Sequence, residues 1–336
     1  MGLRFSRTRP VANSTRPGAR TVRWRIAFVL CVLMLAPISA GADTARIEAA
    51  WRTWLAASGA PDAALAITKD GVVVHVASAG QDPDTAVPIA SLSKALTGIC
   101  LYELQREGHL RLDAPLGTYM ANASAEMRDV PLSTFMTHRA GTGEDSAQGF
   151  TTRDARAGAG LNQRLLRDLL AGSARPGEFT YTNEGFVVLT GVIERVMGAD
   201  YFEVCAPRLG IEIPETMVYA GTAGWGGWSL SPRAYGEVIA RYFTPAGFDG
   251  RPPNLWASAT LQRGRIYGFG MFSRPLEGGW AHWHSGRFCF RGGVEVGSYT
   301  LQMPSGWGAV TTFKKCLSHD QSNALDLALF EALAAR

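Results

Sequence analysis

Two groups of strand-like sequence, one near each end of the chain, constrain its fold more than any other feature. The first group is a hairpin in which Ala63–Thr68 and Val72–Ala77 flank an Asp-Gly turn. The second group follows Pro232 and contains four strand-like runs: Tyr267–Phe272, Gly279–Trp283, Val294–Gln302 and Trp307–Phe313. Strands at both ends with helices between them predict one antiparallel sheet assembled from both ends of the chain.

Helical periodicity predicts the remaining elements, and short helices and loops are expected between the two groups of strands. The clearest helical patterns are Arg46–Ala57, Ser91–Arg106, Leu161–Leu170, Phe186–Met197, Arg233–Phe243 and Asn323–Ala335. Residues 141–160 are polar and rich in glycine, which predicts a surface loop. The predicted fold class is α+β: an antiparallel β-sheet flanked by helices, forming an α/β lobe (43–108 and 231–336) with an inserted all-helical lobe (109–230).

The first 42 residues have the composition of an export signal. Seven arginines and no acidic residue precede an apolar run, Ile26–Ala36, which Pro37 ends before the small residues Ala40-Gly41-Ala42. The apolar run is shorter than the roughly 20 residues that a membrane span needs. We therefore expect a cleaved leader over residues 1–42, a periplasmic or secreted protein, and no stable membrane span after the leader is removed. An uncleaved anchor is the alternative.

Charge and side-chain spacing exclude two kinds of partner. The formal net charge of +4 becomes 4 − 7 = −3 without the leader, so the sequence has no excess of basic residues that would suggest nucleic acid as a partner. His282 and His284 alternate along a predicted strand and point the same way, but no cluster of acids or thiols accompanies them. We expect no metal site and no organic cofactor.

Four cysteines lie beyond the leader: Cys100, Cys205, Cys289 and Cys316. An even number in an exported protein permits two disulfides in three connectivities, and buried reduced thiols are the alternative. Cys289 and Cys316 belong to neighbouring strand-like runs. We hypothesise that these two cysteines form a disulfide.

Ser91 and Lys94 are three residues apart at the start of a predicted helix. Lys94 is one of only four lysines in a chain that has 29 arginines. A lysine amine can lose its proton when it is desolvated, whereas a guanidinium cannot, so this lysine is a candidate base beside a candidate nucleophile. A serine N-cap and a solvated helix face would produce the same spacing without any chemistry.

Two further triplets follow in the sequence, Tyr181-Thr182-Asn183 and His284-Ser285-Gly286. In this order, Ser-x-x-Lys, Tyr-x-Asn and His-Ser-Gly resemble the serine β-lactamase and penicillin-binding-protein superfamily, specifically its class C β-lactamase-related branch. That branch includes β-lactamases, D-Ala-D-Ala carboxypeptidases, D-amino-acid peptidases and esterases. The resemblance covers about residue 63 to the end and includes the segments Phe135–Gly141 and Tyr267–Gly270.

The resemblance implies a role for each residue of the three triplets. Ser91 would be the nucleophile, and Lys94 and Tyr181 would be the acid/base pair, with the base left open between them. The expected substrate-binding groups are Asn183, His284, Ser285, Gly286 and Arg287. The backbone N–H groups of Ser91 and Arg287 would form the oxyanion hole. Simpler roles are a packed aromatic residue for Tyr181 and a turn or helix cap for Asn183.

The third triplet departs from the pattern of typical β-lactamases of this branch, which have lysine where this chain has His284. The charge of a histidine is expected to change near neutral pH, whereas that of a lysine would not. Arg287 follows the triplet and is either a clamp for a substrate carboxylate or a solvent-facing strand residue. His138, in the segment Phe135–Gly141, is expected to be structural.

These observations predict an exported serine hydrolase that forms an acyl-enzyme on Ser91 and cleaves an amide or ester, in the manner of a D-Ala carboxypeptidase or esterase. The alternative within the class is a class C-type β-lactamase. The alternative from another class is a penicillin-binding sensor that does not turn its ligand over. The expected partner is a small molecule or peptide: a cell-wall peptide, a β-lactam or an ester.

Overall fold

The computed structural model divides the chain into two units, Met1–Gly41 and Ala42–Arg336. The described residues are 37–143, 145, 151–156, 158–245, 247–250, 258–290 and 295–335. The predicted leader lies outside the described residues up to residue 36 and stays a prediction. None of the helices within the described ranges combines the length and apolar composition that crossing a bilayer requires.

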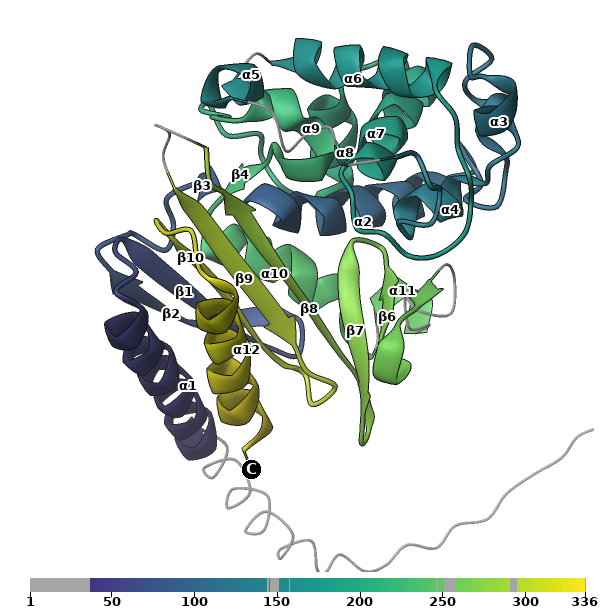
Figure 1. Ribbon diagram of the computed structural model, residues 1–336. Helices are drawn as coiled ribbons and strands as arrows, with labels where there is room; N and C mark the ends of the chain where they lie inside the picture. Colours follow the sequence, from purple (N-terminus) through teal and green to yellow (C-terminus); the bar gives the residue numbers. More distant parts are fainter. Residues whose placement is uncertain are drawn as a thin grey trace, which may run out of the picture. The chain divides into compact units, whose positions relative to one another are not determined.

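Eight antiparallel strands form the main sheet, in the order β2-β1-β10-β9-β8-β7-β6-β5 (Figure 1). The strands are β1 (Ala63–Lys69), β2 (Val72–Ala79), β5 (Ala259–Thr260), β6 (Ile266–Gly268), β7 (Met271–Leu276), β8 (Gly279–Phe288), β9 (Val296–Gln302) and β10 (Trp307–Phe313). The N-terminal hairpin joins the C-terminal strands where β1 pairs with β10. The prediction of one sheet built from both ends of the chain is confirmed.

Two tight turns decide whether the strand boundaries predicted from the sequence agree with the structure. Asp70 and Gly71 both have positive φ, 49° and 91°, which suits the two-residue turn predicted between β1 and β2. A second such turn occurs at Phe269 and Gly270, with φ of 50° and 76°. It divides the single strand expected over Tyr267–Phe272 into β6 and β7. The sequence pattern did not reveal this turn, because the strand-like alternation of side chains continues on both sides of it.

The helices agree with the predicted patterns to within a few residues, except at the N-terminus. The longer helices are α1 (Pro37–Ser58), α2 (Ser93–Arg106), α6 (Ala159–Ala171), α7 (Glu184–Met197), α8 (Tyr201–Leu209), α10 (Pro232–Tyr242) and α12 (His319–Ala334). The short ones are α3 (Ala125–Arg128), α4 (Leu132–Met136), α5 (Thr152–Arg156), α9 (Ala223–Gly226) and α11 (Gly247–Gly250). The helix expected from Arg46 begins at Pro37, since proline is tolerated in a first helical turn. The surface loop expected over residues 141–160 contains α5.

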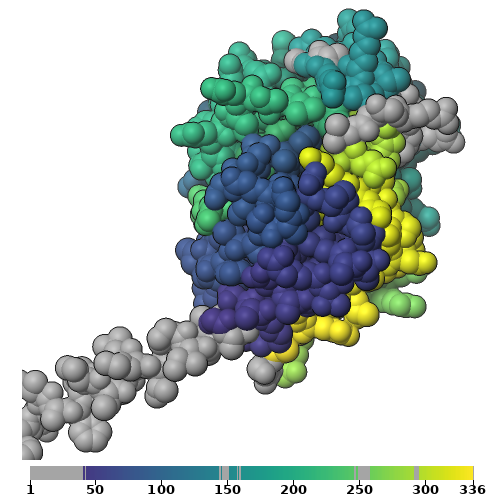
Figure 2. Space-filling model, turned by 90° about the vertical axis from the view of Figure 1, so that its left-hand side faces the viewer, coloured from purple at the N-terminus to yellow at the C-terminus, as the bar shows by residue number. Residues whose placement is uncertain are grey.

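One face of the sheet is covered by two helices from opposite ends of the sequence, α1 and α12. Their apolar residues, among them Trp51 and Leu329, share a core with Leu65 and Leu301 of the sheet. The Arg46 guanidinium donates hydrogen bonds to backbone carbonyls of the last turn and end of α12. Figures 1 and 2 both show the N-terminal helix beside the C-terminal segment, which is yellow in Figure 2.

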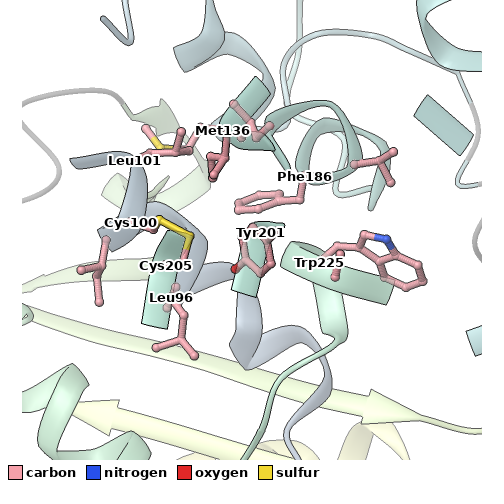
Figure 3. Packing of buried hydrophobic residues seen from close by; sticks show 14 of the residues in the cluster. Leu96, Cys100, Leu101, Met136, Phe186, Tyr201, Cys205 and Trp225 are labelled. Carbon is pink, nitrogen blue, oxygen red and sulfur yellow. A yellow bond between two sulfur atoms is a disulfide. The ribbon is translucent and has the colours of Figure 1, made fainter. Parts of the chain in front are cut away.

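The other face of the sheet packs against α10, and beyond it α2, α7, α8 and α9 pack together. Adjacent residues of β10 show the two faces: Ala309 belongs to the core under α1 and α12, and Val310 to the core shared with the helices. A disulfide between Cys100 and Cys205 joins α2 to α8 inside this second core (Figure 3). The hypothesised disulfide Cys289–Cys316 is confirmed.

Candidate active site

Ser91 lies in a single turn of 3₁₀-helix, Ala90–Leu92, directly before α2. The turn begins with Ala90 at a φ of 48°, a left-handed conformation that bends the chain sharply into the helix. Leu92 occupies the N-cap position of α2, and no side chain caps the helix there. The simple alternative of a serine N-cap is therefore wrong, and the Ser91 hydroxyl instead accepts a hydrogen bond from Lys94 Nζ at 3.1 Å.

Lys94 is completely buried, which excludes the alternative of a solvated helix face. Its Nζ atom contacts three oxygens: Ser91 Oγ at 3.1 Å, Asn183 Oδ1 at 2.7 Å and the carbonyl of Trp225 at 2.8 Å. Burial lowers the pKa of this amine to about 7, against the opposing charges of Asp145 and Glu184. Near neutral pH the amine is therefore divided between a form that can accept a proton and one that can donate it.

Tyr181 precedes α7 and projects its phenol between Ser91 and His284. Burial raises the pKa of the phenol well above its ordinary value; a hydrogen bond with Ser91 opposes this rise, and the charge of Asp145 adds to it. The phenol oxygen lies 3.5 Å from His284 Nε2, the long limit for a hydrogen bond. Tyr181 therefore stays protonated at neutral pH and can donate a proton there.

Asn183 stands at the N-cap position of α7 without capping it, so the simple alternative of a helix cap is wrong. Its side chain bridges two charged groups instead. Its Oδ1 accepts a hydrogen bond from Lys94, and its Nδ2 donates to both carboxylate oxygens of Asp145, at 3.2 and 3.0 Å. These two contacts fix which end of the amide faces the amine.

Asp145 is a site residue that sequence reasoning missed. It lies within the polar stretch over residues 141–160, where no periodicity or motif spacing distinguishes it from its neighbours. The only signal was that this polar, glycine-rich loop directly follows the segment Phe135–Gly141, which is part of the resemblance. Loops of this kind commonly carry specificity, but their paths depend on tertiary contacts.

His284 lies within β8 rather than at its end, because β8 continues to Phe288. Its Nδ1 is 2.7 Å from the carbonyl oxygen of Ser285, which can only accept, so Nδ1 carries the proton and Nε2 faces Tyr181 as an acceptor. Burial, reinforced by the charge of Lys94, lowers the pKa of His284 to about 3. The expectation that its charge changes near neutral pH is therefore wrong: the imidazole is neutral there.

The rest of the third triplet brings the backbone of β8 against the nucleophile. A Cβ on Gly286 would lie 2.3 Å from the carbonyl oxygen of Ile89 and 3.0 Å from Ser91 N, so only glycine permits this approach. The side chains of Ser285 and Arg287 are exposed. Within the described residues, the Arg287 guanidinium makes neither a hydrogen bond nor an ion pair.

The turn between β6 and β7 and several buried aromatic rings pack against the residues of the site. A Cβ on Gly270, in the turn between β6 and β7, would lie 2.2 Å from the carbonyl carbon of Lys94, so this turn packs directly on the backbone of α2. The buried ring of His138 lies 4.4 Å from the ring of Tyr181, and its Nδ1 accepts a hydrogen bond from Thr182 N. These contacts agree with a structural role for His138.

The structure brings Ser91, Lys94, Tyr181, Asn183 and His284 together, although they come from widely separated parts of the chain. Ser285 and Gly286 lie on the adjoining strand. Arg287 follows them, with its side chain in solvent. In the described part of the chain, no group of three or more His, Cys, Asp and Glu side chains is arranged to hold a metal ion.

Comparisons with known proteins agree with this arrangement. Residues 47–210 match the family described as Beta-lactamase. This match includes the first two of the three triplets, and it agrees with their resemblance to the serine β-lactamase and penicillin-binding-protein superfamily. No curated protein matched the sequence.

Solved structures share the fold at low sequence identity. SurE with D-Leu has a TM-score of 0.68 and 20% identity, over 87% of this chain and 76% of that chain. A β-lactamase/D-alanine carboxypeptidase from Pseudomonas syringae has a TM-score of 0.67 and 16% identity, over 86% and 99%. A class C β-lactamase has a TM-score of 0.64 and 13% identity, over 90% and 99%. The predicted α+β fold class is confirmed, and these neighbours identify it as the β-lactamase/transpeptidase-like fold.

Proposed function

We propose that this protein is an exported serine hydrolase that cleaves an amide or ester through an acyl-enzyme on Ser91. One observation carries the proposal: a fully buried lysine amine, with a pKa of about 7, lies 3.1 Å from the Ser91 hydroxyl. Such an amine is a general base poised for use near neutral pH. We retain the cleaved leader over residues 1–42 and the two-lobe division of residues 43–336 as parts of this proposal.

Lys94 is the better candidate for the base in acylation. Its amine takes the proton of the Ser91 hydroxyl as Oγ attacks the substrate carbonyl, and the backbone N–H groups of Ser91 and Arg287 stabilise the resulting oxyanion. The Tyr181 phenol cannot play this part as a phenolate at neutral pH, because burial raises its pKa. Tyr181 instead delivers a proton to the departing amine or alkoxide and regains one from the Lys94 ammonium. Water then releases the acyl group from Ser91.

Asn183 and His284 orient these groups. The amide oxygen of Asn183 holds the Lys94 amine beside Ser91 Oγ. The acceptor nitrogen of His284 faces the Tyr181 O–H and helps to direct its proton. Ser285 and Gly286 line the strand along which the substrate backbone would lie.

Within this class, we favour a peptidase or esterase over an efficient β-lactamase. The third triplet presents a neutral imidazole where typical β-lactamases of the branch have a lysine. A substrate carboxylate would then need another cation, and the candidate is Arg287, whose exposed guanidinium has no partner within the described residues. The printed description of the Pseudomonas syringae neighbour, β-lactamase/D-alanine carboxypeptidase, supports either activity.

Active-site labelling tests the assignment directly. A fluorophosphonate or a fluorescent penicillin should label the protein at Ser91, and the Ser91→Ala variant should stay unlabelled. Equal labelling of both proteins would reject Ser91 as the nucleophile. Stoichiometric labelling by the penicillin with negligible release, together with no turnover of an ester or peptide substrate, would instead support a penicillin-binding sensor.

A comparison of three substrates separates the activities within the class. A nitrophenyl ester and a D-Ala-D-Ala peptide should be turned over with higher kcat/KM than a chromogenic cephalosporin. Faster hydrolysis of the cephalosporin would overturn our preference and favour the β-lactamase alternative.

A further inference from the structure

A cavity of about 200 Å³, the His282 cavity, lies at the end of the sheet where β8 begins. The end of α10, the turn between β7 and β8 and the turn between β9 and β10 enclose it, and the two turns lie at the same end of the sheet (Figure 1). Pro245 is exposed and Trp280 is half-buried, so the cavity reaches the surface beside them. Besides His282, most of its lining side chains are apolar: Phe243, Pro245, Trp280, Met303 and Pro304.

The His282 cavity is separate from the proposed reaction centre. Strand β8 passes both, since His282 lines the cavity and Gly286 packs against the backbone at Ser91. These two residues are four apart along the strand, which corresponds to about 13 Å. The residues that surround Ser91 do not line the cavity.

His282 brings a polar group into this apolar surrounding. Its side chain is buried, and its ring lies 5.4 Å from the ring of Phe243. Its Nδ1 is 2.8 Å from Ser273 Oγ on the neighbouring strand β7. Within the described residues Nε2 has no hydrogen-bond partner, so Nε2 is the ring nitrogen that His282 offers to the cavity.

The Ser273 hydroxyl decides which nitrogen of His282 carries the proton. Burial lowers the pKa of His282 to about 4, so the imidazole is neutral near pH 7 and has one N–H. Ser273 is buried, and among the described residues its hydroxyl contacts only His282 Nδ1. If Nδ1 donated this hydrogen bond, the serine O–H would lack an acceptor in the interior, which is costly. The hydroxyl therefore donates to Nδ1, and Nε2 carries the proton.

An N–H group in an apolar cavity suits a ligand that brings one uncharged acceptor. A buried water molecule usually makes two to four hydrogen bonds, and the apolar walls offer it few partners. No charged side chain of the described residues lines the cavity, so a charged ligand would lose its hydration without compensation. Because a cavity of about 150 Å³ can hold benzene, about 200 Å³ has room for one ring and a small substituent.

We propose that the His282 cavity binds a compact, uncharged molecule that joins one ring, or an apolar group of similar size, to a carbonyl oxygen. The apolar walls enclose the ring, and His282 Nε2–H donates a hydrogen bond to the oxygen. This inference is independent of the proposed function, because no step of the reaction at Ser91 involves the cavity.

The tautomer of His282 can be checked without a ligand. Long-range ¹H–¹⁵N spectra at pH 7.5 should show the proton of His282 on Nε2. His284 is the internal control and should show the opposite tautomer, because its Nδ1 donates to the carbonyl of Ser285. A proton on Nδ1 of His282 would overturn the inference, since the cavity would then offer an acceptor.

Acetophenone and α-methylstyrene are a matched pair of probes, because a CH₂ group in the second replaces the carbonyl oxygen of the first. Both are titrated into protein that carries ¹³C-labelled methionine methyl groups. Each should shift the signal of Met303, which lines the cavity, but not that of Met120, which is buried among the helices. Acetophenone should bind about tenfold more tightly, which corresponds to one hydrogen bond of ordinary strength.

Two variants separate the hydrogen bond from the cavity itself. His282→Leu removes the donor, so it should weaken acetophenone about tenfold and change α-methylstyrene by less than about twofold. Thr244→Trp places a large side chain at the cavity, leaves the Ser273–His282 pair in place and should abolish binding of both probes. Its matched control is Thr53→Trp, at an exposed position of α1, which should change neither affinity.

Three results of the titrations would overturn the inference. The first is equal affinity of the unaltered protein for the two probes. The second is binding of acetophenone that neither His282→Leu nor Thr244→Trp weakens. The third is the absence of any shift at Met303 with acetophenone in the millimolar range.

Discussion

At the scale of single residues, the proposed chemistry depends on a lysine whose lowered pKa leaves part of its amine neutral, and so able to accept a proton, near neutral pH. We predict that the rate of fluorophosphonate labelling rises with pH and has a midpoint near 7, because only the neutral amine of Lys94 can take the proton of Ser91. Lys94→Arg should reduce the rate by at least about 100-fold, since a guanidinium does not deprotonate. A rate independent of pH between 5 and 9 would contradict this role.

Asp145 offers a second check on the same titration. Its carboxylate stabilises the Lys94 ammonium and so raises the pKa of the amine. Asp145→Asn should therefore move the midpoint of the labelling profile to lower pH. The control is Asp154→Asn, which removes a carboxylate of α5 that contacts Thr151, and it should leave the midpoint unchanged. A shift to higher pH in the first variant would show that the carboxylate affects the amine differently.

Tyr181 should matter most when the leaving group is poor. An amide nitrogen must be protonated to depart, whereas a nitrophenolate departs without help. We expect Tyr181→Phe to lower kcat/KM for a peptide by about 10²–10³ and for a nitrophenyl ester by much less. Equal losses on both substrates would indicate that the phenol acts before the leaving group departs.

The residues of the site differ in how far sequence could predict them. The three triplets were predictable because their residue types, order and spacing can be recognised in the sequence alone. The neutral state of His284 was not, since it follows from burial that only the folded structure reveals. Asp145 could not be chosen among the polar residues of its loop, because its place beside Asn183 depends on the path of that loop.

At the scale of elements, the turn between β6 and β7 sets the position of the helix that carries Lys94. Gly270 combines a φ of 76° with a close approach to the Lys94 backbone, whereas Gly278 has a φ of 85° and open space around it. Gly278→Ala should therefore lower the free energy of unfolding by about 1 kcal/mol, the cost of the left-handed backbone alone. Gly270→Ala should cost at least about 1–3 kcal/mol more and should slow labelling of Ser91.

The check is chemical denaturation of both variants, together with their labelling rates. Similar losses of stability in the two variants would mean that the turn does not press on α2.

The turn between β6 and β7 could not be predicted from the sequence, since the alternating pattern of its residues concealed the break between the two strands. The Asp-Gly turn between β1 and β2 was predictable because its residue types are diagnostic.

The two disulfides constrain different lengths of chain. Cys100 and Cys205 are 105 residues apart, and Cys289 and Cys316 are 27 residues apart. In the loop-entropy description, removal of the longer link costs about 4–5 kcal/mol and removal of the shorter about 3.5 kcal/mol. We therefore expect the Cys100→Ala/Cys205→Ala variant to unfold at lower denaturant concentration than Cys289→Ala/Cys316→Ala, and the opposite order would contradict this expectation.

At the scale of the whole molecule, buried histidines should make the protein sensitive to acid. Burial lowers the pKa of His282 to about 4, and the pKa values of His138 and His284 are lowered in the same direction. Between pH 6.5 and 4 the unfolded chain binds protons at these side chains that the folded protein does not. The free energy of unfolding should therefore fall as the pH falls through this window.

His282→Asn isolates one of these contributions at a residue outside the proposed site. The variant should narrow the difference in unfolding free energy between pH 7.5 and pH 4.5 by about 2–3 kcal/mol, as the lowered pKa of His282 requires. Urea denaturation at the two pH values gives this difference for both proteins. An unchanged difference would show that His282 is not held neutral by the fold.

The pairing of β1 with β10 has a consequence for synthesis and turnover. Because β8 to β10 are synthesised after α2, a nascent or prematurely terminated chain can carry the Ser91 hydroxyl but lack the strand that packs against it. Such a fragment has an incomplete sheet as well as an incomplete reaction centre. The reaction proposed for Ser91 therefore requires that β8 to β10 have emerged and folded against the first part of the sheet.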